Sequence, residues 1–247
     1  MRSTRTRVAL IALAVAATTL AGCTDDADST SPASGSAASP APTGTGIGAL
    51  SADEILQRAK AALAEAKSYR AKGRFDQGGQ QTTIDLKVDG RDFTSVMSFG
   101  KAEVELLAVD GKKYIRPNEQ FWTMSTGARQ GEALARGIGD RWVAGADQDR
   151  SFAELFTIGS ADEFLKPTGA LSKGQEKKVG GVSAIGLKDA GDPDSVFYVA
   201  TTGKPYPLQL VGKGDSAVVF SDFGAAFPGI KAPAADRVVD LGEVAGK

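Results

Sequence analysis

The sequence predicts an α+β domain in which a large, curved antiparallel sheet packs on a long N-terminal helix and on short mid-chain helices. Two observations predict this class. Residues 51–68 carry a capping signal followed by apolar residues at helical spacing. About eleven short segments with strand-like alternation follow, separated by glycine-containing turns. A sheet of that size curls, so its apolar face encloses a hollow that a helix, side chains or an external apolar molecule must fill.

The predicted helix runs from Ala52 to about Ser68. Ser51 and Glu54 have the spacing of a capping box, in which each satisfies a backbone N–H of the other. The residues behind them place small and branched apolar side chains on one face. This face can therefore lie close against a sheet.

Alternation with a period of two begins directly after the helix. From Tyr69 to Phe75, apolar residues alternate with charged ones, which predicts a strand with one dry and one wet face. The pairs Asp89-Gly90 and Asp110-Gly111 are typical of hairpin turns. The further predicted strands are Ile84–Val88, Phe93–Phe99, Val104–Val109, Lys113–Arg116, Phe121–Met124, Gln175–Val179, Val182–Leu187, Val196–Thr201, Pro207–Val211 and Ala217–Phe220.

The segment between these two groups of strands is less regular. Residues 128–139 are weakly helical, Trp142-Val143 favours a short strand, and the aromatic residues at 152, 156 and 164 suggest short helices. The end of the chain, from Gly224, is rich in proline and alanine and is expected to be extended. We expect Val238, Val239 and Leu241 to dock on the domain.

The N-terminus has the features of an export signal. Residues 1–7 contain three arginines and no acid, and the apolar run Val8–Leu20 is shorter than the about 20 residues that a membrane span needs. The run ends in Leu20-Ala21-Gly22-Cys23, which resembles the bacterial lipobox. This resemblance implies cleavage after residue 22 and a diacylglycerol thioether, with palmitate as a typical acyl group, on Cys23. An ordinary buried cysteine is the alternative, but Cys23 is the only cysteine and stands where the apolar run stops.

Residues 23–50 are expected to be a tether. Thr24–Ala49 consists almost entirely of Ser, Thr, Pro, Ala and Gly, so it cannot bury enough apolar surface to offset its chain entropy. A flexible coil of this length spans on the order of 30 Å, and its composition is compatible with O-glycosylation. The predicted organisation is thus a signal peptide (1–22), a lipidated linker (23–50) and one folded domain (51–247).

The composition excludes several function classes. The chain has no histidine, which excludes Ser-His-Asp and Cys-His catalysis and histidine-ligated zinc. Its formal net charge of −1 argues against nucleic-acid binding. We therefore expect no enzyme, no cofactor and no metal site.

Weaker chemical signals are interpreted as structural. Ser98 and Lys101 have Ser-x-x-Lys spacing but stand at a strand end rather than on a helix. The acidic residues Asp189, Asp192 and Asp194 around a proline favour a solvated turn over a calcium site. The cationic side chains on the first strand, Arg70, Lys72 and Arg74, favour a solvated sheet face over contact with anionic lipid headgroups.

Framework features of the domain resemble the actinobacterial lipoproteins of the LppX/LprG type, within the LolA-like group. They are the capped helix leading into the first strand and the segments Val109–Tyr114 before Phe121-Trp122, Val182–Leu187 after Gly180-Gly181, Val199–Pro207 and Phe220–Gly224. The resemblance implies an unclosed half-barrel around helices. It also implies an apolar cavity that hosts the acyl chains of lipids, glycolipids or lipoprotein anchors.

These features give two hypotheses. The first is a carrier or binder of acyl chains on the outer face of the cytoplasmic membrane, with the membrane, a lipid or glycolipid and an envelope protein as partners. The second is a non-enzymatic envelope sensor or protein-interaction module without a lipid ligand. From alternation alone, the candidate ligand-binding residues are Ile55, Leu63, Phe75, Ile84, Leu86, Val88, Phe93, Met97 and Phe99. In a filled half-barrel the same residues are core.

Overall fold

The computed structural model describes residues 46–77, 79–148 and 150–245. They belong to one compact unit, Pro42–Lys247. The predicted signal peptide, the lipidation site Cys23 and most of the predicted linker lie outside the described residues. Within the described part of the chain, no helix is long and apolar enough to cross a membrane.

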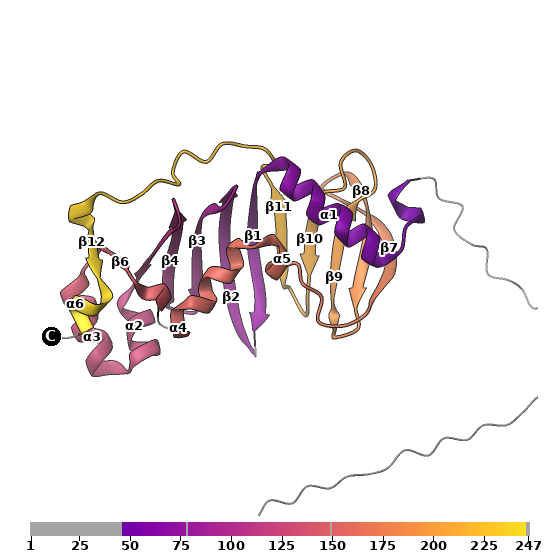
Figure 1. The fold of residues 1–247 in the computed structure, drawn as a ribbon. Coiled ribbons are helices and arrows are strands. Elements are labelled where there is room, and N and C mark those ends of the chain that lie inside the picture. Colours follow the sequence, from indigo (N-terminus) through magenta and orange to yellow (C-terminus); the bar gives the residue numbers. More distant parts are fainter. Residues whose placement is uncertain (1–45, 78, 149, 246–247) are drawn as a thin grey trace, which may run out of the picture. The chain divides into compact units, whose positions relative to one another are not determined.

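A twelve-stranded sheet forms the frame of the unit (Figure 1). Its strands are β1 (Ser68–Gln77), β2 (Gln80–Asp89), β3 (Asp92–Phe99), β4 (Ala102–Val109), β5 (Lys112–Pro117), β6 (Trp142–Ala144), β7 (Leu171–Val179), β8 (Val182–Asp189), β9 (Asp192–Ala200), β10 (Pro207–Val211), β11 (Ala217–Ser221) and β12 (Val238–Asp240). Their spatial order is β12-β6-β5-β4-β3-β2-β1-β11-β10-β9-β8-β7. The outermost strands do not pair with each other, so the sheet is open, and the predicted α+β class with an unclosed sheet is confirmed.

The helical elements are α1 (Ala52–Ala66), α2 (Glu119–Thr126), α3 (Ala128–Ile138), α4 (Arg150–Ala153), α5 (Ala161–Phe164) and α6 (Leu241–Ala245), with 3₁₀ turns η1 (Ile47–Ala49), η2 (Ala146–Gln148), η3 (Glu154–Gly159) and η4 (Ala235–Arg237). The capping box of α1 is present, with the Glu54 N–H 3.3 Å from the Ser51 hydroxyl oxygen. The helix ends earlier than predicted because Lys67 adopts a φ of +65° and turns the chain into β1. The folded unit also includes η1 from the predicted linker, since Ile47 packs against the core.

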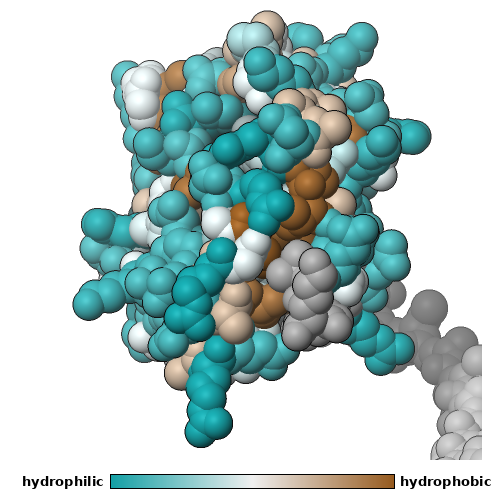
Figure 2. All heavy atoms as spheres, turned by 90° about the vertical axis from the view of Figure 1, so that its left-hand side faces the viewer, coloured by the Kyte–Doolittle hydropathy of each residue, from teal (hydrophilic) through white to brown (hydrophobic). Residues whose placement is uncertain are grey.

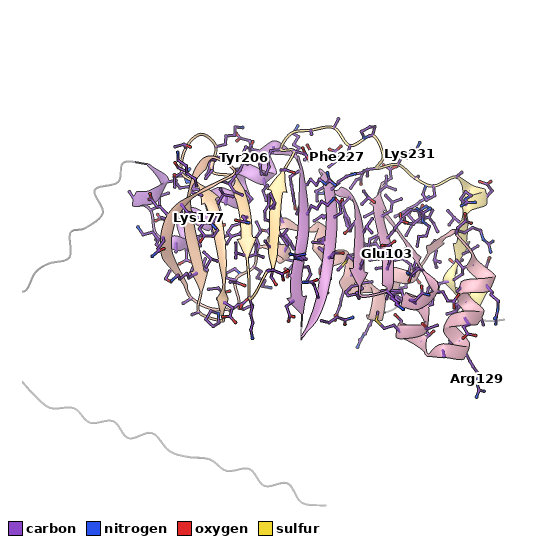
Figure 3. All side chains as sticks on the ribbon, turned by 180° about the vertical axis from the view of Figure 1, so that it is seen from behind. Glu103, Arg129, Lys177, Tyr206, Phe227 and Lys231 are labelled. Carbon is purple, nitrogen blue, oxygen red and sulfur yellow. The ribbon has the colours of Figure 1, made fainter. Side chains whose placement is uncertain are left out.

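The helices cover one face of the sheet, which we call the inner face. In Figure 1, α1 crosses in front of the C-terminal strands β11 to β7, α4 lies in front of the N-terminal strands, and α5 lies near β11, below α1. Seen from behind in Figure 3, the strands stand in front of α1 and the opposite, outer face is turned to the viewer. Figure 2 looks at the end that carries β12, α3 and α6, where a brown apolar patch lies within a mainly hydrophilic surface.

The protein's own aromatic side chains fill the N-terminal half of the hollow. Phe156 of η3 lies 6.2 Å from Phe93 between ring centroids, and Phe121 of α2 lies 6.2 Å from Phe99. Trp122, which is 1% exposed, meets Phe152 edge-on at 5.8 Å. This half of the inner face is therefore packed core, as expected for the large aromatic residues of a domain.

Two strand predictions are corrected. Phe121–Met124 was predicted to be a strand but belongs to α2, because the Asn118 side chain caps the helix by accepting the Phe121 N–H at 2.8 Å. The C-terminal segment adds the unpredicted strand β12, which pairs in parallel with β6. The sheet is therefore mixed, with twelve strands where about eleven antiparallel ones were predicted.

Cations on the outer face of β1 are paired with carboxylates of the protein. Arg70 donates two hydrogen bonds to Asp85, at 2.7 and 2.5 Å. Lys72 lies 3.4 Å from the same carboxylate, and Arg74 lies 2.6 Å from that of Asp215. The hydrogen bonds from Arg70 lower the pKa of Asp85. These pairings agree with the solvated sheet face predicted for the three cations.

Candidate functional site

An apolar cavity of about 150 Å³ lies on the inner face in the C-terminal half of the sheet; we call it the inner pocket. It is bounded by α1, by α5 with the segment that follows it, and by strands β7 to β10. Its apolar lining consists of Leu56, Phe164, Leu165, Pro167, Leu171, Leu187, Phe197 and Leu210. Its polar lining, from Lys166, Thr168, Asp189, Asp192 and Ser195, belongs to the chain after α5 and to the β8–β9 hairpin.

A second cavity of about 390 Å³ adjoins the inner pocket, and we call it the mouth. The two share the lining residues Phe164, Asp192, Ser195 and Leu210. The mouth is more polar, because its lining includes Asp192, Asp194 and Lys213 and reaches the end of β1 at Arg74 and Asp76. Together the inner pocket and the mouth form a groove with an apolar end and a charged opening.

Hydrogen bonds hold the acidic hairpin beside the groove in place. Asp189 accepts the Thr168 N–H at 2.6 Å and the Gly191 N–H at 2.8 Å. Burial opposes ionisation of Asp189, but these hydrogen bonds outweigh it and keep the pKa of its carboxyl below the usual value. Asp192 accepts the Ser195 hydroxyl at 2.5 Å. Among the described residues, no group of three His, Cys, Asp or Glu side chains is placed to hold a metal ion.

A third cavity, of about 310 Å³, lies at the other end of α1; we call it the side pocket. Its lining residues are Lys60, Leu63, Ala64, Lys67, Tyr69, Val88, Gly90, Gly159, Ala161 and Asp162. The Phe220 ring lies between this cavity and the inner pocket. Its centroid is 6.3 Å from that of Tyr69, which lines the side pocket, and 5.9 Å from that of Phe164, which lines the inner pocket. Aromatic packing thus stands between the two cavities.

The candidate ligand-binding residues occupy different environments. Phe75 lines the mouth, and Leu63 and Val88 line the side pocket. The others pack in the protein's own core or at its margin: Ile55, Ile84, Leu86, Phe93 and Met97 are buried, and Phe99 is half-buried against Phe121. Ile84 also borders a shallow, charge-lined groove on the outer face.

The residues that line the inner pocket are not among the candidates that alternation indicates. Leu171, Leu187, Phe197 and Leu210 lie in or beside predicted strands, but nothing local indicated which strands α1 covers. The structure shows that α1 contacts β7, β9 and β10 as well as β1. The pairing of β11 with β1 brings those strands under the helix.

No known family model matches the chain, and no curated protein matches its sequence. Similar solved structures include an uncharacterized conserved protein from Thermus thermophilus, with 13% identity, a TM-score of 0.42, and coverage of 76% of this chain and 98% of that one. LprF from Mycobacterium bovis has 13% identity and a TM-score of 0.42, covering 74% and 97%. Mycobacterium tuberculosis lipoprotein LppX has 10% identity and a TM-score of 0.40, covering 68% and 93%. The framework features of the sequence resemble lipoproteins of the LppX/LprG type, and LppX is among the similar structures. These identities and TM-scores are too low to transfer a function to this chain.

Proposed function

We propose that this chain is an extracytoplasmic lipoprotein, anchored through Cys23 to the outer face of the cytoplasmic membrane, that binds acyl chains in the groove under α1. The observation that carries the proposal is the lining of the inner pocket, whose walls on α1, β8, β9 and β10 are Leu56, Leu187, Phe197 and Leu210. Each CH₂ group moved from water into such a pocket contributes about 0.8 kcal/mol. A carrier of this kind requires no catalytic group.

The two ends of the groove suit the two ends of a lipid. The apolar end can take the terminal part of a chain, while the charged mouth can keep a polar headgroup in contact with water. The mouth, at about 390 Å³, has the size typical of small-ligand sites. The inner pocket, at about 150 Å³, is smaller, so the proposal concerns part of one chain and not a whole multi-chain lipid.

The proposal is tested by lipid analysis of the lipoprotein purified from native membranes. Native mass spectrometry should show the chain with its anchor and, in addition, a non-covalently bound lipid that organic extraction removes. Detection of the anchor alone, together with no uptake of added fatty acid, would count against the proposal. A stoichiometric protein partner in place of lipid would instead favour the sensor or interaction module.

Replacing Cys23 with alanine is expected to abolish lipidation. Since Cys23 is the only cysteine, no other side chain of the chain can carry a thioether-linked diacylglycerol. Labelling cells with radioactive palmitate should mark the wild-type protein and leave the variant unlabelled, and the variant should retain residues 1–22. Gly22→Ala is the matched control, because it keeps a small residue before the cysteine and should be labelled normally. Equal labelling of Cys23→Ala and wild type would disprove the anchor.

A further inference from the structure

The inner pocket ends at a group of aromatic rings. Phe164 of α5 and Phe197 of β9 line the pocket. The Phe220 ring of β11 lies behind both, with its centroid 5.9 Å from that of Phe164 and 6.0 Å from that of Phe197. Phe197 and Phe220 are each two residues further along their strands than Ser195 and Val218, which line the mouth. These rings therefore form the end of the pocket that is remote from the mouth.

The N-terminal half of the hollow has no space for a further chain. Phe156 packs on Phe93 there, and a Cβ atom added at Gly159 would overlap the Phe93 ring. Phe152 packs edge-on against Trp122, which is 1% exposed. The protein's own side chains thus fill this half, as is usual in a close-packed interior.

The side pocket does not extend the groove either. It shares no lining residue with the mouth or with the inner pocket. The two chains of a diacyl lipid start at neighbouring carbon atoms, so a lipid whose headgroup lies in the mouth would have to place both chains in the inner pocket.

The volume of the inner pocket limits what can enter it. The cavity measures about 150 Å³. An apolar cavity of about this size holds one benzene molecule, which has six carbon atoms. The mouth is larger, but its lining includes the charged residues Asp192, Asp194 and Lys213. The apolar end of the groove therefore takes the last carbon atoms of one chain, and a second chain does not fit beside it.

We propose that the groove binds lipids with a single acyl chain, either a lysolipid or a free fatty acid, and that Phe220 sets how deeply the chain enters. This inference rests on the proposed function, because it assumes an acyl chain in this groove. A diacyl lipid would leave its second chain in the polar mouth or in water. Each CH₂ group left in water weakens binding about fourfold.

The ligand class is tested by competition on the purified full-length lipoprotein. Palmitoyl lysophosphatidylglycerol and dipalmitoyl phosphatidylglycerol have the same headgroup and the same type of chain, and they differ in the number of chains. They are offered in equal amounts together with palmitic acid, and native mass spectrometry identifies the bound lipid by its mass. The lysolipid should exceed the diacyl lipid at least about a hundredfold, since four CH₂ groups left in water already produce that factor. Palmitic acid in the same mixture shows which of the two single-chain lipids is preferred.

Phe220→Leu tests the depth of the pocket. The substitution keeps an apolar side chain but removes the ring, so the closed end should move back. With fatty acids of increasing length, affinity should continue to rise for about two CH₂ groups beyond the wild-type limit. Phe156→Leu is the matched control, because Phe156 is 6% exposed against 4% for Phe220 but packs in the N-terminal half. Its chain-length limit should equal that of wild type.

The outcomes separate this inference from the proposed function. If the diacyl lipid binds as well as the lysolipid, the single-chain inference is wrong while acyl-chain binding stands. If Phe220→Leu has the same limit as wild type, Phe220 does not set the depth. The competition uses wild type alone, so it decides the ligand class even if Phe220→Leu does not fold. If wild type binds none of the three lipids, the proposed function fails and this inference with it.

Discussion

Gly73→Ala is expected to destabilise the folded unit by about 3 kcal/mol or more, at the upper end of the usual cost of overpacking. Gly73 lies on β1 opposite Val218 of β11. A Cβ atom at this position would overlap the carbonyl oxygen of Ala217 and lie 2.7 Å from the Cα of Val218. Both are backbone atoms of the neighbouring strand, so no side-chain rotation can relieve the contact. The strands must move apart.

The position matters because the β1–β11 pair joins the two halves of the sheet. Separating these strands exposes core on both sides, including Ala71 and Phe220, which face each other across the pair. Urea unfolding followed by tryptophan fluorescence measures the loss, since a destabilised variant unfolds at lower denaturant concentration.

Gly229→Ala is the matched control for this substitution. A Cβ at Gly229 would meet no atom within 4 Å, so its effect should stay within about 0.5 kcal/mol. If Gly73→Ala unfolds at the same urea concentration as Gly229→Ala, β1 and β11 do not pair in the register described here.

The correct predictions came from signals that act within a few residues. The capping box predicted the start of α1, because its hydrogen bonds join residues three apart. The pairs Asp89-Gly90 and Asp110-Gly111 predicted the hairpins that join β2 to β3 and β4 to β5. The sequence also contains a local signal for α2. Asn118 followed by Glu119 is a helix start, and it outweighs the strand preference of Phe121 and Trp122.

The pairing of β1 with β11 could not be predicted in this way. It joins Ala71 to Phe220, and no turn or cap connects segments so far apart in the sequence. This pairing decides which strands lie under α1 and therefore where the groove is. Alternation shows which side chains share a face of a sheet, but not whether a helix or a cavity lies over them. For this reason the candidates from alternation include Phe93 and Met97, which lie in the core, and omit Leu187 and Leu210, which line the inner pocket.

Leu210→Trp is expected to weaken the binding of long acyl chains roughly a hundredfold. Leu210 is half-buried on β10 and lines both the inner pocket and the mouth. An indole at this position takes space that about four CH₂ groups would occupy, which corresponds to about 3 kcal/mol of lost transfer free energy. Binding is measured on the purified lipoprotein with added fatty acids, by native mass spectrometry.

Gln209→Trp is the matched control for the groove variant. Gln209 precedes Leu210 on the same strand and pairs with Tyr198 and Val219. Its side chain points to the outer face, where it accepts a hydrogen bond from Lys177. The same bulk is thus added on the opposite side of the sheet, and fatty-acid binding should not change.

Leu171→Trp, on β7, narrows the inner pocket from another wall. If it weakens the binding of long chains as Leu210→Trp does, the loss is not due to a folding defect peculiar to Leu210→Trp.

Chain length distinguishes a filled pocket from general damage to the domain. In the wild type, affinity should rise with each added CH₂ until the groove is full and then level off. In Leu210→Trp the rise should stop at a shorter chain, because the apolar end is blocked while the mouth remains open. Short fatty acids should therefore bind both proteins alike, and only long ones should tell them apart. A uniform loss over all chain lengths would show that the substitution disturbs the domain, and unchanged binding of long chains would place the acyl site outside this groove.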